Sequence, residues 1–443
     1  MVTVARDAGD GTGKMPRLFG RSPMTIYLDV TTSYLWRRNP VGIVRVEREL
    51  AAGLRAQIPG LRFCRIDVKR GAHVLMSESE VDAVLSQEWC RPVAGSSTIR
   101  PMLVAAAKRF LPKSLIRVVR QARRVVPIKP PEGLGRDDVF VSAGFDWDYL
   151  PTEHVGAMKR QTGCKVIQFC YDTIPVDFPE YTVSEEFSER LFGHLLELGR
   201  NADLVLAISD STKNDLLNFW QRESIAAAPP VVTVPLASAS PAAAGVSSRS
   251  PRLDALIAQG PFVVYVSTLE VRKNHRLLFN LWREFHADRQ HAVPKLILVG
   301  AKGWGIDDLL RELECSNAGR DGAIQVWSDV DDVLLQGLYE HCEFGLFPSF
   351  YEGWGLAATE LLAHGKVCVV SRGSSLEEAT QGLCPAYHPC DYLGWRDEIV
   401  RLSGDSAYRC QREFEIATRF RSRAWADCAR DWAREVVALH EQA

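Results

Sequence analysis

The sequence predicts an α/β protein made of two Rossmann-like, doubly wound domains that face one another across a cleft. Short apolar runs of strand length alternate with helical stretches in both halves of the chain, which is typical of βαβ units. The chain has 443 residues, enough for two or three domains. Residues 237–254 are rich in Ala, Ser and Pro and predict a linker between the halves.

The first domain is expected at residues 24–236, after a disordered stretch at 1–23. Its predicted strands lie at residues 24–30, 61–68, 138–144, 165–170, 204–209 and 231–236. Residues 31–40 are expected to form a turn, and Val44, Leu50 and Leu54 fit one face of the helix that follows. Ser209 and the Ser, Thr and Asp residues after it are suited to capping a helix, and we assign them no other role here.

The second domain is expected at residues 255–410, followed by a C-terminal helix within 411–443. Its predicted strands lie at residues 261–267, 295–300, 324–327, 342–346 and 367–371. Its predicted helices include a start near Arg276 and the stretches 334–342, 374–378, 396–402 and 422–440.

The composition is that of a soluble globular protein. Apolar residues make up 46% of the chain, charged residues 24%, and the net charge is −2, so no overall field attracts nucleic acid and none is expected as a partner. The chain has 11 cysteines but no Cys-x-x-Cys, which argues against a disulfide framework or zinc ribbon and fits a reducing compartment. No signal peptide or apolar run of about 18 residues is visible, so we expect a cytoplasmic protein.

One segment departs from this neutral balance. Residues 100–129 contain nine Lys or Arg and no Asp or Glu, with apolar residues broadly at helical spacing. Such a segment can lie on an anionic membrane surface, which would make the protein peripheral at the inner face of the cell membrane. A solvent-facing helix over the first domain explains the pattern equally well.

The most informative stretch is residues 347–360, where a strand, a Gly-rich turn and a helix start follow one another. Gly353 and Gly355 allow a sharp turn or a close approach to a ligand. The helix start offers free N–H groups that suit a phosphate. Glu352 and Glu360 suit hydroxyl groups, because carboxylates accept their hydrogen bonds. Together these features suggest a nucleotide sugar as the ligand.

This stretch resembles the Glu-x7-Glu signature of family 4 of the retaining glycosyltransferases, which have the GT-B fold. The resemblance implies that Glu352 lies beside the donor sugar and that Glu360 holds the ribose hydroxyls. It places the turn residues Gly353, Trp354, Gly355 and Leu356 in the donor site as well. The chain departs from the family at Ala357, where Pro is usual. In this fold the last helix often crosses back to the first domain, so we expect residues 411–443 to do so.

Two cations form a second element of the predicted donor site. Arg272 and Lys273 follow a strand and precede a helix, where they can neutralise a diphosphate. With Asn274 they resemble an Arg-Lys-Asn element whose residues contact the donor phosphates. They would stabilise the charge that grows on the leaving diphosphate.

The first domain carries the expected acceptor side. Gly42 and Arg45 resemble a Gly-Ile-x-Arg segment near the first helix, where the glycine leaves room for donor or acceptor; a solvated charge explains Arg45 equally well. Tyr171, Asp172 and Pro175 resemble a His-Asp-x-Ile-Pro loop facing the reacting sugar, with Tyr171 in place of His. A phenol with a pKa of roughly 10 donates a hydrogen bond rather than acting as a base at neutral pH. Asp172 is therefore the better candidate to orient an acceptor hydroxyl.

The predicted function is the retaining transfer of a hexosyl group, mannose or similar, from a nucleotide-diphosphate sugar to a sugar hydroxyl. GDP- or UDP-sugars are the expected donors, and a surface polysaccharide or lipid-linked glycan the expected acceptor. Glu352, Asp172, Lys273 and Arg272 are the candidate catalytic residues. No cofactor or metal is expected, and we interpret the Asp-x-Asp spacing of Asp146 and Asp148 as coincidental.

Two alternatives remain open at this stage. A GT-B phosphorylase or epimerase would turn over with phosphate or with the nucleotide sugar alone. A non-catalytic nucleotide-sugar-binding or scaffold protein would show no activity to lose on Glu352→Ala.

Overall fold

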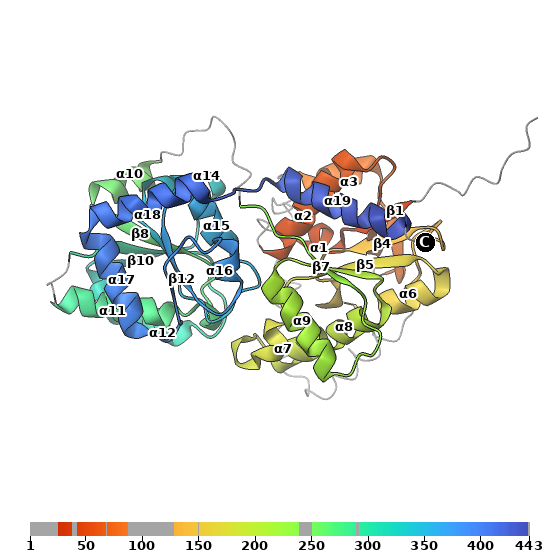
Figure 1. Cartoon of the computed structure of the whole chain (residues 1–443), viewed down its shortest axis with the longest axis horizontal. Helices are drawn as coiled ribbons and strands as arrows, with labels where there is room; N and C mark the ends of the chain where they lie inside the picture. Colours follow the sequence, from red (N-terminus) through yellow and green to blue (C-terminus); the bar gives the residue numbers. More distant parts are fainter. Residues whose placement is uncertain are drawn as a thin grey trace, which may run out of the picture.

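The computed structural model describes residues 25–37, 42–67, 69–86, 128–148, 150–238, 250–288 and 292–441. The described chain forms two α/β lobes that lie side by side (Figure 1). The expected disordered stretch at 1–23, most of the predicted linker and residues 100–127 of the basic segment lie outside the described residues.

The N-terminal lobe is built on a seven-stranded sheet with the order β3-β2-β1-β4-β5-β6-β7. All neighbouring strands are parallel except β2 and β3. The strands are β1 (Ile26–Asp29), β2 (Arg62–Asp67), β3 (Ala72–Leu75), β4 (Val139–Ser142), β5 (Lys165–Cys170), β6 (Leu204–Ala207) and β7 (Val231–Thr233). Strands β1, β4 and β6 are buried along their whole length, as expected for a sheet covered on both faces.

The helices of this lobe connect successive strands. They are α1 (Thr31–Leu35), α2 (Ile43–Gln57), α3 (Glu78–Leu85), α6 (His154–Thr162), α7 (Ile174–Asp177), α8 (Glu185–Asn201) and α9 (Asp210–Arg222), with short 3-10 turns at Asp146–Asp148 and Pro179–Tyr181. The expected turn at residues 31–40 is wrong, because α1 occupies its first half. Ser and Thr are poor helix formers, but the carboxylate of Glu47 accepts from the backbone N–H of Ser33 at 2.6 Å and holds this turn of helix in place.

The C-terminal lobe contains a six-stranded parallel sheet with the order β10-β9-β8-β11-β12-β13, which is the Rossmann order. The strands are β8 (Phe262–Val266), β9 (Lys295–Val299), β10 (Ile324–Trp327), β11 (Gly345–Phe347), β12 (Cys368–Ser371) and β13 (Ala386–Tyr387). The helices of this lobe are α10 (Pro251–Ala258), α11 (His275–Asp288), α12 (Asp307–Cys315), α13 (Asn317–Arg320), α14 (Asp332–His341), α15 (Leu356–Ala363), α16 (Ser375–Ala379), α17 (Tyr392–Gly404) and α18 (Ser406–Arg419), with a 3-10 turn at Val271–Lys273. Helix α19 (Trp425–Glu441) follows them in the sequence.

Two of these helices shift the boundaries expected from the sequence. Helix α10 begins at Pro251, inside the predicted linker, and buries Leu253 and Leu256 in the core of the C-terminal lobe. Helix α18 begins at Ser406 and buries Ile416 in the same core, so the expected boundary at residue 410 falls inside a helix of that lobe.

Helix α19 lies on the N-terminal lobe, against α2 (Figure 1). Cys428, Trp432 and Val436 are buried in the apolar core of that lobe. Gly53 of α2 allows the close approach, because a Cβ there would overlap the Cβ of Ala429. Among the described residues, no helix combines the length and apolar character needed to span a membrane.

Candidate functional site

The Gly-rich stretch of the sequence leaves the carboxyl end of β11 and leads into α15, as its pattern predicts. Gly355 caps α15 with φ +115°, a conformation that L side chains rarely adopt, and a Cβ there would overlap the side chain of Leu376. The side chain of Ser375 donates to the carbonyls of Glu352 and Trp354, at 2.8 and 2.9 Å. The loop before α15 is thus fixed by the close packing of Gly355 on Leu376 and by the hydrogen bonds from Ser375.

Glu352, Arg272 and Lys273 form the centre of the site. Lys273 Nζ donates to Glu352 Oε1 at 2.5 Å, and Arg272 Nη1 donates to Oε2 at 2.9 Å. Only 12% of the Glu352 side chain is exposed, with 16% and 15% for the two cations. The carboxyl ends of β8 and β11 bring these residues together, because the two strands are neighbours in the sheet.

The charges in this group shift one another's protonation. Burial alone would raise the pKa of Glu352, but the Lys273 and Arg272 charges outweigh it and lower that pKa to about 2. Burial and the neighbouring Arg272 charge lower the pKa of Lys273, against the opposing effect of Glu352. A ligand that brought negative charge to this place would find two cations already fixed there.

Sequence reasoning missed two side chains that support this centre. Ser349 Oγ donates to Glu352 Oε1 at 2.6 Å, and it lies 3.1 Å from the hydroxyl of Tyr265. Tyr265 is fully buried and its hydroxyl donates to the carbonyl of Lys273 at 2.7 Å. Ser349 stands inside the signature stretch and could have been found from its place there. Tyr265 gives no local signal, because it appears as one more apolar residue of a buried strand.

The loop that carries the cations is also held firmly. Asn274 adopts the left-handed conformation with φ +54°, and its side chain donates to the carbonyls of Pro348 and Pro389 at 3.1 and 2.9 Å. Arg272 forms a second ion pair, from Nη2 to Glu270 Oε1 at 2.8 Å. The Arg272 guanidinium is thus held between two carboxylates, those of Glu270 and Glu352.

Glu360 lies in a separate contact between the two lobes. Arg45 Nη1 of α2 donates to Glu360 Oε1 at 2.6 Å, and the Tyr339 hydroxyl donates to Oε2 at 3.2 Å. The Glu360 side chain is 4% exposed and that of Arg45 is 18% exposed. Gly42, at the start of the same helix, has φ +51°, and a Cβ there would meet nothing within 4 Å.

The predicted acceptor-side residues follow β5 and face the signature loop. The Tyr171 hydroxyl donates to the Ala143 carbonyl at 2.5 Å. Asp172 Oδ1 accepts from the backbone N–H of Ile174 at 3.1 Å. Burial raises the pKa of Asp172, while the charge of Arg272 across the lobe boundary opposes that shift.

Trp354, one of the predicted donor-site residues, is buried in an apolar cluster shared with the N-terminal lobe.

The Asp-x-Asp spacing in the N-terminal lobe is used for ion pairs. Asp146 lies 2.9 Å from Nε2 of His154, and Asp148 accepts from Arg190 at 2.6 Å. Within the described part of the chain, no three His, Cys, Asp or Glu side chains are grouped so that they could hold a metal ion.

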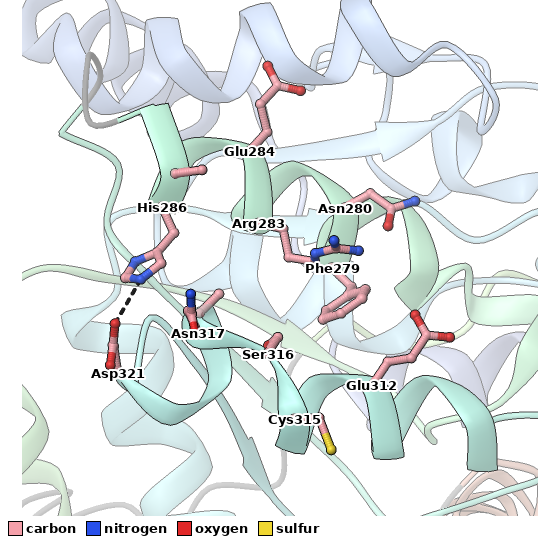
Figure 2. Close-up of a pocket in the computed structure, with 12 residues that line it drawn as sticks. Phe279, Asn280, Arg283, Glu284, His286, Glu312, Cys315, Ser316, Asn317 and Asp321 are labelled. Carbon is pink, nitrogen blue, oxygen red and sulfur yellow. Dashed lines mark hydrogen bonds and ion pairs between the residues drawn. The ribbon is translucent and has the colours of Figure 1, made fainter.

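The C-terminal lobe also has a broad depression (Figure 2). Its volume is about 1050 Å³, and it is lined by residues of α11, α12 and α13. His286 pairs with Asp321 at 2.9 Å on its wall. It contains none of the side chains predicted from the sequence to bind a ligand.

The fold and the site define a class of protein. Residues 260–405 match the family model described as glycosyl transferases group 1. A solved structure described as trehalose-6-phosphate from E. coli bound with UDP-2-fluoro glucose superposes with a TM-score of 0.58 at 14% identity, covering 95% of this chain and 99% of that one. Anabaena Alr3699/HepE, described in complex with UDP and glucose, gives 0.51 at 15% identity and covers 95% and 98%. The chain has the GT-B fold, as the signature resemblance implied.

The curated relatives are more specific. The chain is 30% identical over 224 residues to O-antigen chain mannosyltransferase B of Escherichia coli, covering 49% of this chain and 55% of the relative. It is 25% identical over 268 residues to the serotype-specific mannosyltransferase WbdA of Escherichia coli, covering 60% and 32%. The chain therefore spans about half of the first relative and a third of the second. The predicted resemblance to GT-B glycosyltransferases is confirmed.

Proposed function

We propose that this protein is a retaining mannosyl- or related hexosyltransferase that uses a nucleotide-diphosphate sugar. The observation that carries the proposal is the Glu352 carboxylate held between Lys273 and Arg272 at the Gly-rich start of α15. Two ordered cations beside a helix start suit a diphosphate, and a carboxylate suits sugar hydroxyls. The mannosyltransferase relatives favour mannose as the sugar.

In the proposed reaction, the bond between the anomeric carbon and the diphosphate oxygen breaks as the acceptor oxygen bonds to the same face of that carbon. The acceptor hydroxyl passes its proton to the departing phosphate oxygen. Lys273 and Arg272 stabilise the negative charge on the leaving group, which is the work that a metal ion performs elsewhere. Asp172 orients the acceptor hydroxyl, and Glu360 holds the ribose.

The acceptor belongs to the same proposal. The similarity to O-antigen chain mannosyltransferase B favours a growing surface polysaccharide or a lipid-linked glycan as the acceptor. A cytoplasmic protein at the inner membrane face would meet such an acceptor, and the basic segment at residues 100–129 would supply the membrane contact.

The first test is thermal denaturation with a panel of GDP-, UDP-, dTDP- and ADP-sugars. A ligand that binds the native state at a hundredfold excess over its dissociation constant stabilises it by about 2.7 kcal/mol. The sugars of one nucleotide should stabilise the wild type and the control Lys302→Met, but not Arg272→Ala or Glu360→Ala. Lys302 is a suitable control because its side chain is 56% exposed and pairs with Asp307 of the same lobe rather than with Glu352.

The second test is transfer with the stabilising donor and a mannose oligosaccharide, followed by NMR of the product anomer. An α-linked product from an α-linked donor supports the proposal. Inversion contradicts the retaining mechanism. Turnover with phosphate or with the donor alone favours a phosphorylase or epimerase, and binding without turnover favours a scaffold.

A further inference from the structure

The start of helix α9 carries side chains that helix capping does not use. Ser209 Oγ accepts from the backbone N–H of Thr212 at 2.9 Å, which is an ordinary N-cap. The side chains of Thr212 and Asp215 continue the same Ser-x-x-Thr-x-x-Asp run, but they contact the other lobe.

Thr212 lies where the two candidate loops meet. Its hydroxyl is 3.2 Å from the carbonyl oxygen of Tyr171 and 3.3 Å from that of Gly353. The loops touch here because residue 353 is glycine: a Cβ at Gly353 would overlap the Tyr171 carbonyl oxygen and lie 3.2 Å from the Cβ of Asp172. A backbone oxygen cannot swing aside as a flexible side chain can.

Asp215 holds the residue on the other side of Glu352. The Tyr351 hydroxyl donates to Asp215 Oδ2 at 2.7 Å. The ring of Phe178, also from the N-terminal lobe, lies 4.9 Å from the ring of Tyr351. The residues before and after Glu352 are therefore both fixed to the N-terminal lobe.

A carboxylate of the C-terminal lobe also contacts the start of α9. Glu378 of α16 accepts from the backbone N–H of Asp210 at 2.8 Å and from that of Ser211 at 3.3 Å. The two helices face each other at the boundary between the lobes (Figure 1). Free N–H groups and the positive dipole end of a helix stabilise such a carboxylate.

We propose that the start of α9 and the residues Tyr351, Gly353 and Glu378 form a closure seam, which locks the signature loop onto the N-terminal lobe. Thr212 and Asp215 are positioning residues in this seam. They hold Glu352 at a set place relative to Asp172, so the sites assigned to donor and acceptor are joined only when the seam is closed. Any effect of the closure seam on the rate of transfer rests on the proposed function, whereas the contacts that form the seam do not.

The seam can be tested without substrate, in the full-length chain. Glu378→Ala removes the acceptor for two amides, and Tyr351→Phe removes the bond to Asp215. Hydrogen exchange at the α9 start should quicken by about tenfold in Glu378→Ala, because hydrogen bonds to a charged acceptor are the strong ones. In the double variant that combines Glu378→Ala with Tyr351→Phe, the radius of gyration from small-angle X-ray scattering should increase as the lobes separate.

Each variant has a matched control within one lobe. Glu377→Ala removes the neighbouring carboxylate, which accepts from the backbone N–H of Gly373 at 3.1 Å. Tyr392→Phe removes a tyrosine–carboxylate bond of 2.7 Å, to Glu284. Neither control should change exchange at α9 or the radius of gyration.

Unchanged exchange and an unchanged radius in the double variant would overturn the seam. If the seam variants open the molecule but no nucleotide sugar binds, the proposed function fails and the seam stands. With an active donor, Asp215→Asn should lower kcat more than it changes the KM for the donor, since Asp215 bonds to Tyr351 rather than directly to a residue assigned to the donor. An equal loss of Tm in seam and control variants, with no opening, would indicate a structural role only.

Discussion

Arg45 of the N-terminal lobe and Glu360 of the C-terminal lobe form an ion pair of 2.6 Å across the lobe boundary. Glu360 is almost fully buried, and the Arg45 guanidinium compensates its charge. The same carboxylate is the one assigned to the ribose of the donor. On the proposed function, donor binding and the contact with Arg45 would therefore compete for Glu360.

The ion pair should be measurable as a coupling energy. In a double-mutant cycle with Arg45→Met and Glu360→Gln, chemical denaturation should give a coupling of about 1–3 kcal/mol. The coupling should shrink when the donor nucleotide saturates the protein, because ribose hydroxyls replace Arg45 at Glu360. Additive single effects without nucleotide would contradict the ion pair. A coupling that nucleotide leaves unchanged would contradict the ribose assignment.

Loss of Lys273 should affect the chemical step. Lys273→Met removes one of two cations from the leaving group, and the removal of one preorganised electrostatic contact typically costs about 10²–10³ in kcat. Steady-state kinetics with a saturating donor measures this loss. Lys302→Met, which removes a surface cation of the same lobe, should keep kcat within about twofold. An equal small effect of both substitutions would remove Lys273 from the candidate catalytic residues.

The sequence predicted well those features that follow from local pattern and strand order. The bounds of β5, Lys165–Cys170, match the predicted strand. Arg272 and Glu352 are 80 positions apart, yet their loops leave neighbouring strands of a Rossmann sheet. Placing both at carboxyl strand ends was sufficient to expect them in one site.

Features that depend on tertiary contact were not predictable in this way. Helix α1 is rich in Ser and Thr and is stabilised by Glu47, a residue of the next helix. The contact of Glu378 with α9 joins segments that no local pattern connects. Tyr265 resembles any buried strand residue until its hydroxyl is located. In each case the partner, rather than the residue itself, decides the role.

Gly355 should be far less tolerant of substitution than Gly365. Both have positive φ, +115° and +74°, but a Cβ at Gly365 meets open space and a Cβ at Gly355 overlaps Leu376. Gly365→Ala should cost only the backbone strain, about 1–3 kcal/mol. Gly355→Ala should cost a further 1–3 kcal/mol or so, because the core around Leu376 must shift. Denaturant unfolding of both variants measures the difference, and equal losses would contradict the overlap.

Glu47 provides a prediction about pH. It is fully buried on α2, with its Oε2 accepting from the backbone N–H and the hydroxyl of Ser33. Burial, reinforced by the nearby charges of Asp29 and Asp146, raises the pKa of Glu47 from 4.5 to about 8 in spite of these bonds from Ser33. The folded protein therefore holds this proton at neutral pH, where the unfolded chain has lost it.

The sign of the effect follows from proton linkage. Between pH 4.5 and about 8 the folded state binds one proton more than the unfolded state at this residue, so this contribution to stability falls as pH rises, by at most about 1.4 kcal/mol per pH unit. Glu47→Gln keeps an acceptor for Ser33 and removes the titration. Its stability relative to the wild type should therefore improve steadily from pH 5 to pH 8 and level off above.

Denaturant unfolding at each pH measures this difference, and histidine titrations common to both proteins cancel. Glu78→Gln on α3 controls for the loss of one formal charge, because its side chain is 78% exposed. A wild-type-minus-variant difference that stays flat between pH 5 and pH 8 would show that Glu47 is already ionised in the folded protein. Such a result would require a cation or a water molecule beside Oε1, since among the described residues that oxygen accepts no hydrogen bond.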